Sequence, residues 1–363
     1  KNYKQMKEKI FKKIKINGVT LKNRFVVSPM CQYSSSNGSP VSWHYKHLTS
    51  LGNSGAGLLM IEATAVEKRG KITHSDMCLE NITQYKKLKK LVKNIKKTSD
   101  IKIGLQISHS GRKGSTELPW VKPNSILKNK SWKTISSSSI KKELNWPNPK
   151  EMNHNDIKNV KQKFMNSSRL AKKLNIDCLE LHMAHGYLLH QFFSPISNKR
   201  HDKYGGNLKN RCRFLLEVGQ LVRKNWPNNK ILGARITGKD WIKNGINLRD
   251  SIYLTKELKI IGFDYVCVSS GGLISKTDFK SRPNFNFYLA RAIKNKCKIK
   301  VRVGGMIDNI NFAKKIINNN YVDLICNARK FIYEPNFILK ELSKLNPKTK
   351  LFQMSKEDVT RYK

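Results

Sequence analysis

Short apolar runs rich in β-branched residues alternate with longer amphipathic segments along most of the chain. Strands are predicted over residues 25–28, 58–63, 101–107, 178–182, 231–237, 265–269, 299–303 and 322–326. Helical periodicity follows each strand, near residues 42–53, 83–97, 155–174, 208–225, 249–261, 285–295, 308–319 and 335–344. Because the runs are almost continuously apolar, they indicate parallel strands buried on both faces. Eight strand–helix repeats predict the α/β class and a (β/α)8 TIM barrel.

Three segments fall outside this repeat. Residues 11–24 alternate in polarity around an Asn-Gly pair, which predicts a β-hairpin that closes the N-terminal mouth of the barrel. Residues 111–152 form a long connection after the third strand, and loops of this length commonly act as lids or binding loops. We therefore expect residues 1–363 to form a single domain, with an active-site loop at 111–152 and a C-terminal tail at 346–363. A doubly wound sheet is disfavoured because no GxGxxG motif follows the first strand.

The charge balance is strongly basic, with 71 Lys and Arg residues against 25 Asp and Glu residues and a formal net charge of +46. Such a balance is typical of nucleic-acid-binding proteins, so nucleic-acid binding is an alternative function. The lysines are spread over nearly every segment and accompany abundant Asn and Ile, so we interpret them as a compositional bias and expect no nucleic-acid partner. In either case, the electric field favours anionic ligands.

The chain is expected to be a cytoplasmic protein without a membrane partner. No apolar run reaches the 18 or more residues that predict a membrane span, and residues 1–15 lack the pattern of a signal peptide. The seven cysteines are scattered, and no two have the CxxC spacing of zinc or iron–sulfur sites. A reduced intracellular protein without a metal centre fits this usage best.

Chemically capable residues gather at the predicted strand ends, where TIM barrels build their active sites. After the seventh strand, Gly304 and Gly305 allow main-chain N–H groups to approach an anion, and Arg329 follows the eighth strand. These two ends predict a phosphate site, although a tight turn and a surface ion pair are the structural alternatives. Cys31, after the first strand, could be a nucleophile, a thiol that tunes a cofactor or a buried small side chain.

The fourth strand ends in an H-x-x-H pattern made by His182 and His185. A zinc site would require a further ligand nearby, so metal binding is the less favoured interpretation. Buried structural histidines are a second alternative. The favoured interpretation is a pair of imidazoles that donate to a substrate oxygen. Tyr187 lies two residues further on, and its phenol could either supply a proton to a carbanion or be a rim aromatic.

Together these segments resemble the old yellow enzyme family. The resemblance rests on the sequence from Leu179 to Phe192, on the Tyr-Gly-Gly that ends at Gly206, and on two shorter matches, Ser28-Pro29-Met30-Cys31 and His109-Ser110-Gly111-Arg112-Lys113. It extends from about Phe11 to Leu345. The Cys31 and Tyr33 pair is similar to the bacterial thermophilic-like branch of ene reductases.

The resemblance implies an FMN cofactor and a set of residues that hold it. The expected FMN-binding residues are Ser28, Pro29, Met30, Cys31, Ala63, Gln106, Arg235, Gly305, Ala328 and Arg329. The expected substrate-binding residues are His182, His185 and Tyr33, and Tyr187 is expected to deliver the proton.

The implied reaction is a ping-pong hydride transfer from NADPH or NADH to an α,β-unsaturated carbonyl or nitro compound. A homodimer or homotetramer is also implied, because members of this branch place a C-terminal Arg in the neighbouring subunit's active site. Arg361 is the residue that could do so here. The alternatives are a flavin barrel that acts on a CoA thioester, a basic nucleic-acid-binding protein, and a flavin-free phosphate-binding lyase or isomerase.

Overall fold

Eight parallel strands close into a barrel in this computed structural model, which describes residues 8–275, 277, 279 and 281–345. Around the ring the strand order is β10-β11-β12-β3-β4-β5-β8-β9. In chain order the strands are β3 (Phe25–Val27), β4 (Leu58–Ala65), β5 (Lys102–Ser108), β8 (Cys178–Met183), β9 (Ile231–Thr237), β10 (Tyr265–Ser269), β11 (Lys300–Val303) and β12 (Leu324–Asn327). The predicted barrel and all eight predicted strands are confirmed, with ends that differ by a few residues.

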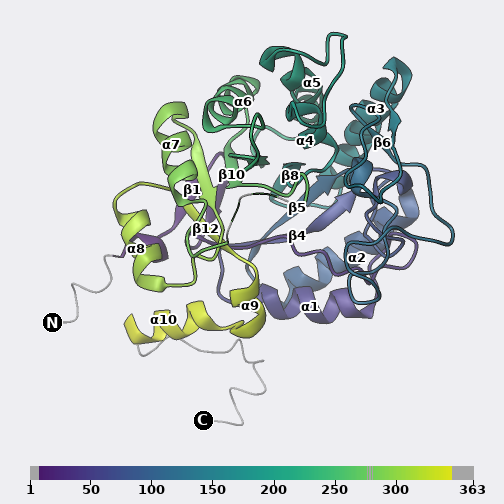
Figure 1. Ribbon diagram of the computed structural model, residues 1–363. Coiled ribbons are helices and arrows are strands. Elements are labelled where there is room, and N and C mark those ends of the chain that lie inside the picture. The colour runs from purple at the N-terminus through teal and green to yellow at the C-terminus, as the bar shows by residue number, and fades with distance from the viewer. Residues whose placement is uncertain (1–7, 276, 278, 280, 346–363) are drawn as a thin grey trace.

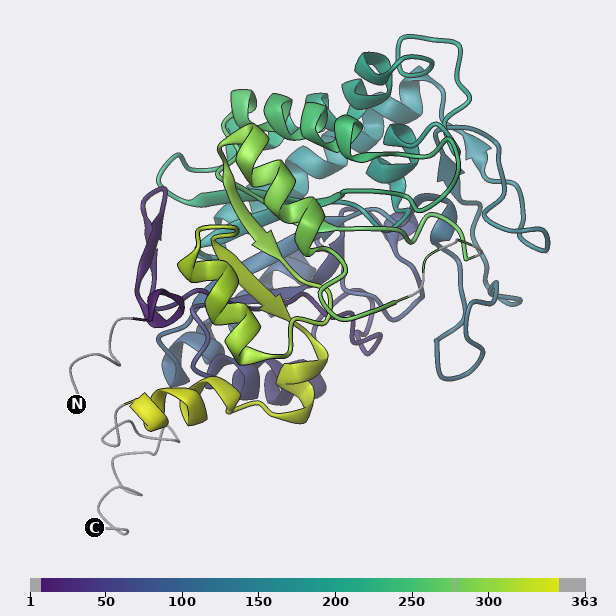
Figure 2. The ribbon, with the colours of Figure 1, turned by 60° about the vertical axis from the view of Figure 1, so that its left-hand side comes forward.

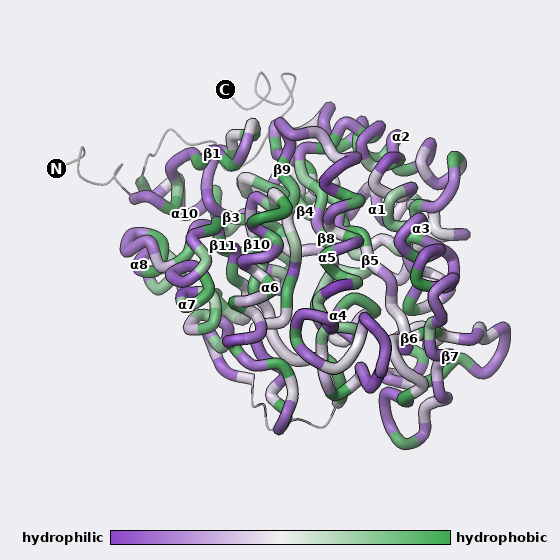
Figure 3. The backbone as a smooth tube through the Cα atoms, turned by 90° about the horizontal axis from the view of Figure 1, so that it is seen from above, coloured by the Kyte–Doolittle hydropathy of each residue, from purple (hydrophilic) through white to green (hydrophobic). Residues whose placement is uncertain are grey.

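Helices surround the barrel on the outside (Figure 1). They are α1 (Ser42–Gly52), α2 (Ile82–Thr98), α3 (His154–Lys172), α4 (Leu188–Phe193), α5 (Leu208–Asn225), α6 (Leu248–Ile261), α7 (Phe287–Cys297), α8 (Ile310–Asn318), α9 (Arg329–Tyr333) and α10 (Phe337–Leu345). Their apolar faces pack on the strands in one continuous core, while hydrophilic stretches follow their outer turns (Figure 3). None of the helices in the described part of the chain is long and apolar enough to span a bilayer.

Helix α2 illustrates how the sequence produces one of these outer elements. The Asn81 side chain accepts a hydrogen bond of 3.0 Å from the main-chain N–H of Gln84, which caps the helix start. Leu88, Leu91 and Ile95 recur at helical spacing and are buried against the barrel, whereas the intervening lysines are exposed. The lysine-rich composition therefore lies on the solvent face and leaves the core apolar.

The predicted hairpin closes the N-terminal end of the barrel. Strands β1 (Ile14–Ile16) and β2 (Val19–Leu21) pair antiparallel. Their buried side chains form a second core cluster with Leu58, Cys178 and other residues from the barrel interior. The hairpin and the long loop lie at opposite ends of the barrel (Figure 2).

The long loop at 111–152 folds over the C-terminal end of the barrel. It contains β6 (Ile135–Ser136), which pairs in parallel with β7 (Lys150–Glu151). The Ser137 hydroxyl donates to the main-chain oxygen of Gln191 at 2.8 Å, which ties the loop to α4. Residues 346–363, including Arg361, lie outside the described residues.

The barrel interior holds a fully buried ion pair between Glu180 of β8 and Arg302 of β11. Tyr265 donates its hydroxyl to Glu180 Oε2 at 2.6 Å, and Gln106 donates its amide to Glu180 Oε1 at 2.8 Å. Because the carboxylate and guanidinium compensate each other, the charges can remain in the core. The same network holds the Gln106 side chain in a fixed orientation.

Replacing Arg302 with Met leaves the buried Glu180 carboxylate without its counterion. We expect a loss of about 3–5 kcal/mol in the free energy of unfolding, measured by urea denaturation. Lys22→Met is the control, because it removes the exposed ion pair with Asp100 and is expected to cost at most about 1 kcal/mol. Equal losses in the two variants would contradict a role for the buried pair.

Candidate active site

The parallel register brings residues from distant segments together at the C-terminal end of the barrel. His182 on β8 is paired with Arg235 on β9. Ala63 on β4 is paired with Gln106 on β5, next to a bulge that follows Ile61 and shifts the strand register. Bulges near active sites commonly redirect side chains. These residues, predicted separately as site residues, therefore line neighbouring strands.

Two left-handed residues turn the chain back immediately after β8. His185 has a φ of 57° and Gly186 a φ of 71°. A side chain at Gly186 would place its Cβ atom 2.4 Å from the main-chain oxygen of Gly272, so this turn requires glycine. As a result, the His182 and His185 rings lie with their centroids 5.1 Å apart, and the Tyr187 ring lies 4.8 Å from His182.

Local hydrogen bonds fix the proton position on His182 and constrain that on His185. The main-chain N–H of Ala184 donates to His182 Nδ1 at 3.2 Å, which places the His182 proton on Nε2. The Ser269 hydroxyl lies 2.6 Å from His185 Nε2. When Ser269 donates in this contact, the His185 proton is on Nδ1. Each ring then keeps one N–H that is free to donate.

Both imidazoles are uncharged near neutral pH. Burial, followed by the nearby charge of Arg235, lowers the pKa of His182 and of His185 well below the usual value. Across the described part of the chain, no group of three or more His, Cys, Asp or Glu side chains is placed to hold a metal ion. The arrangement is therefore that of two neutral hydrogen-bond donors.

A cavity of about 380 Å³ opens next to Tyr187, whose ring contacts that of His182, and we call it the Tyr187 cavity; neither histidine belongs to its lining. Tyr33, Tyr187 and Lys113 line it. Burial raises the pKa of Tyr187 well above the usual value, so its phenol keeps its proton. Lys113 donates to the main-chain oxygens of His185 and Gly272 at 2.8 and 2.9 Å, and its ammonium lies 5.0 Å from the centre of the Tyr187 ring.

Several features of the strand ends match the requirements of a flavin. Arg235 Nε is buried and has no hydrogen-bond partner among the described residues, although a buried guanidinium normally has one. Gln106 Nε2 is already engaged by Glu180, which leaves its Oε1 as the group that can accept a hydrogen bond. Burial raises the pKa of the Cys31 thiol, so it stays protonated and is not a thiolate nucleophile.

The ends of β11 and β12 match the requirements for binding the phosphate of a flavin nucleotide. Gly305 has a φ of 112°, and a Cβ atom there would lie 2.8 Å from Asn286 Nδ2, so the backbone needs glycine to take this path. Helix α9 begins at Arg329, directly after Ala328, and the Arg329 side chain is exposed. With only five residues in α9, main-chain N–H groups would contribute more than a helix dipole.

One supporting pair was not predicted from the sequence. His44 of α1 lies 3.2 Å from Glu62 Oε1 of β4, and both side chains are buried. Glu62 Oε2 accepts the main-chain N–H of Gln32 at 2.8 Å. Glu62 therefore holds the segment that follows Cys31, and His44 lies beside the other oxygen of the same carboxylate. The sequence places His44 within an amphipathic helix, where nothing distinguishes it from an ordinary surface residue.

The match to known proteins covers nearly the whole chain. Residues 9–347 match the family model described as NADH:flavin oxidoreductase / NADH oxidase. The chain belongs to this family. The family includes the old yellow enzymes, so the resemblance noted in the sequence is confirmed, and the chain is a flavin oxidoreductase. This membership excludes a flavin-free lyase or isomerase and argues against a dedicated nucleic-acid-binding protein.

Curated relatives and solved structures agree with this assignment. The chain is 35% identical over 333 residues to an NADPH dehydrogenase from Clostridium acetobutylicum, which covers 91% of this chain and 94% of the relative. Its fold matches an Old Yellow Enzyme from Pichia with a TM-score of 0.77 and 22% identity, over 94% of this chain and 87% of that one. It also matches a 2-naphthoyl-CoA reductase with a TM-score of 0.84 and 22% identity, over 93% of this chain but only 52% of the longer reductase.

The neutral histidine pair makes stability depend on pH. In the unfolded chain these imidazoles take up protons near about pH 6.5, whereas in the folded protein their lowered pKa prevents it. The contribution of the two neutral imidazoles to the free energy of unfolding is therefore fully present above about pH 6.5 and is lost as the pH falls below it. We expect His182→Gln with His185→Gln to flatten the fall in unfolding free energy between pH 7 and 5 by roughly 1–2 kcal/mol per imidazole.

The matched control is His201→Gln, because His201 is exposed. Urea denaturation across this pH range provides the measurement. An unchanged pH profile in the double variant would contradict the neutral state of the pair.

Proposed function

We propose that this flavin oxidoreductase is an FMN-dependent ene reductase, which reduces the C=C bond of α,β-unsaturated carbonyl or nitro compounds with NADPH or NADH. The observation that carries the proposal is the pair of neutral imidazoles, His182 and His185, whose rings lie 5.1 Å apart next to Tyr187, which lines an open cavity. Two donors converging on one oxygen suit the negative charge that develops there when hydride reaches the β-carbon.

The flavin in this proposal is FMN. Its ring would rest on the main chain of residues 28–31 and contact Ala63 and Gln106. Arg235, whose Nε has no partner among the described residues, would supply positive charge that favours the reduced flavin. The phosphate would be held by Gly305, Ala328 and Arg329. When bound, FMN supplies the hydride chemistry, first as acceptor from NAD(P)H and then as donor to the alkene.

Side chains of the candidate site hold the substrate in place for hydride transfer. His182 Nε2 and His185 Nδ1 donate to the carbonyl or nitro oxygen, and the Tyr33 side chain helps to hold it. A preorganised donor of this kind is worth about 3 kcal/mol of transition-state stabilisation. Because the rings are neutral, the donors keep their protons while the oxygen gains negative charge.

Tyr187 delivers the proton to the α-carbon. Its raised pKa keeps the phenol protonated, and its ring lies beside His182 at the cavity wall. Lys113 stands next to the same ring, and its protonated form stabilises the phenolate that forms when the proton leaves; burial lowers the pKa of Lys113 to about 7. A proton donor placed in this way contributes about 10²–10⁴-fold to the rate.

The direct test is the absorbance of the purified protein in the flavin region. We expect a yellow protein that bleaches with NADPH under anaerobic conditions and recolours when cyclohexenone is added. The released cofactor should have the mass of FMN. A colourless protein that takes up no FMN would overturn the proposal.

His182→Ala combined with His185→Ala tests the oxygen-binding role separately. We expect FMN to stay bound, because the proposed flavin contacts come from other residues, while tight binding of a phenol next to the flavin is lost. The binding is followed by the long-wavelength absorbance that a phenolate produces with oxidised flavin.

The control removes His154 and His201, which are both exposed, and should bind the phenol like the parent protein. If the double variant of His182 and His185 retained the parent's phenol affinity, the pair would have no part in holding the substrate oxygen.

A further inference from the structure

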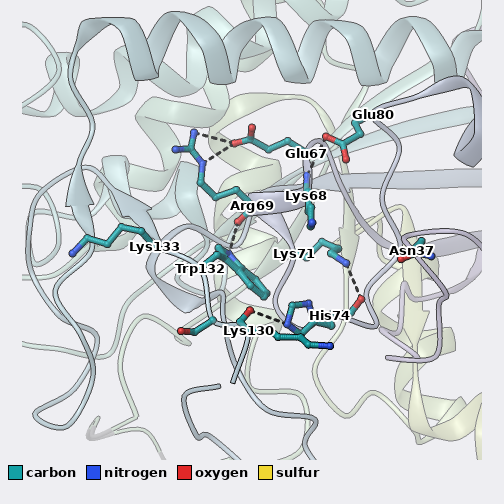
Figure 4. Close-up of a pocket in the computed structure, with 11 residues that line it drawn as sticks. Asn37, Glu67, Lys68, Arg69, Lys71, His74, Glu80, Lys130, Trp132 and Lys133 are labelled. Atoms are coloured by element: carbon teal, nitrogen blue, oxygen red, sulfur yellow. Dashed lines mark hydrogen bonds and ion pairs between the residues drawn. The ribbon is translucent and has the colours of Figure 1, made fainter. Parts of the chain in front are cut away.

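A second, larger cavity of about 1010 Å³ opens on the same end of the barrel (Figure 4). We call it the Trp132 pocket. Its walls come from the loops that follow β3, β4 and β5. These loops lie at the C-terminal end of the barrel, where TIM barrels place their active sites. None of the residues predicted to bind FMN or substrate lines it, so the proposed function leaves this pocket unused.

The lining of the Trp132 pocket is strongly cationic. Its positive side chains are those of Lys68, Arg69, Lys71, Lys130 and Lys133. The acidic side chains are Glu67 and Glu80, and both are engaged: Glu67 by Arg69 at 3.3 Å and by His109 at 3.0 Å, and Glu80 by the main-chain N–H of Lys68 at 3.2 Å. The pocket therefore has an excess of positive charge that its own carboxylates do not neutralise.

An aromatic surface accompanies these charges. The Trp132 indole is half-buried, and its Nε1–H donates to the main-chain oxygen of Arg69 at 3.0 Å. The His74 ring lies 5.1 Å from it, edge to face. Figure 4 shows the indole between Arg69 and His74. A fixed aromatic ring among cations is suited to binding a phosphorylated nucleoside. The base can stack on the aromatic ring, and the phosphates can form ion pairs with the cationic side chains.

The Trp132 pocket shares a wall with the Tyr187 cavity. In the segment 71–74, Lys71 and His74 line the Trp132 pocket, whereas Ile72 and Thr73 line the Tyr187 cavity. The segment is held rigidly, since Ser110 donates to the Lys71 main-chain oxygen at 2.8 Å and Thr73 donates to Asp76 at 2.9 Å. The two cavities are therefore neighbours, with one rigid segment forming part of both linings.

We propose that the Trp132 pocket binds an adenosine diphosphate that carries an additional phosphate on its ribose. This group is shared by NADPH and coenzyme A, and it offers a base for Trp132 and three phosphates for the lysines. The inference rests on the proposed function, because that function requires a reductant or thioester whose reactive end reaches the Tyr187 cavity. It would make the enzyme prefer NADPH to NADH.

Isothermal titration calorimetry on the flavin-loaded protein at constant salt tests the binding directly. The probes are 2′,5′-ADP for the NADPH tail, 3′,5′-ADP for the coenzyme A tail, and 5′-AMP, which differs from both only by lacking the second phosphate on the ribose. We expect one of the two doubly phosphorylated probes to bind about tenfold more tightly than 5′-AMP, which corresponds to one charge-assisted hydrogen bond.

A matched pair of variants assigns this binding to the pocket. Lys68→Ala with Lys133→Ala removes two exposed lysines of the lining, and Lys87→Ala with Lys90→Ala removes two exposed lysines of α2 and the same total charge. We expect the pocket variant to lose about tenfold in affinity for the ribose-phosphorylated probe, and the α2 variant to lose much less. If 2′,5′-ADP is the tighter probe, the pocket variant should also raise the KM for NADPH by a larger factor than the KM for NADH.

Each result decides the proposal. Tighter 2′,5′-ADP binding identifies the NADPH tail, and tighter 3′,5′-ADP binding identifies coenzyme A. Equal affinity for all three probes, or equal losses in the two variants, would overturn it. Failure of the proposed function is seen separately, as absence of FMN or of alkene reduction, since the calorimetric comparison needs neither turnover nor a particular alkene.

Discussion

Closure of eight parallel strands into one ring is the constraint on which every other feature of this protein depends. Because all strands run in the same direction, each one must end at the same face of the barrel. His182 and Arg235 thus become neighbours although two helices and their connecting loops separate them in the sequence. The opposite end is closed by the β1–β2 hairpin, so cofactor and substrate have one face available.

Burial then decides what the residues at this face can do. The same environment that lowers the pKa of His182 and His185 raises the pKa of Tyr187, and all three groups are left neutral. Neutral imidazoles donate without adding a charge to the cavity, and a neutral phenol keeps a proton that it can give away. The permanent charge is supplied separately by Arg235. Hydride transfer and proton transfer can therefore be supported from different walls of one site.

The strands could be predicted from the sequence, and so could the positions of the candidate site residues at the strand ends, because both follow a simple rule. Continuous apolar runs mark buried parallel strands, and polar residues such as His182 and Gln106 stand where the runs end. The His44–Glu62 pair could not be predicted, since it depends on how α1 packs on β4. The β6–β7 pairing and the Trp132 pocket were also missed, because two-residue strands and a long loop leave no periodic pattern and take their shape from tertiary contacts.

The central claim is that two neutral imidazoles, each with its free N–H fixed by a neighbour, face the substrate oxygen. Nitrogen-15 NMR of protein labelled in its histidines tests it most directly, with signals assigned by single His→Gln variants. At pH 7 we expect His182 to carry its proton on Nε2 and His185 on Nδ1, and both signals to shift when a phenol binds. A doubly protonated ring at either position, or signals that do not respond to the phenol, would contradict the account.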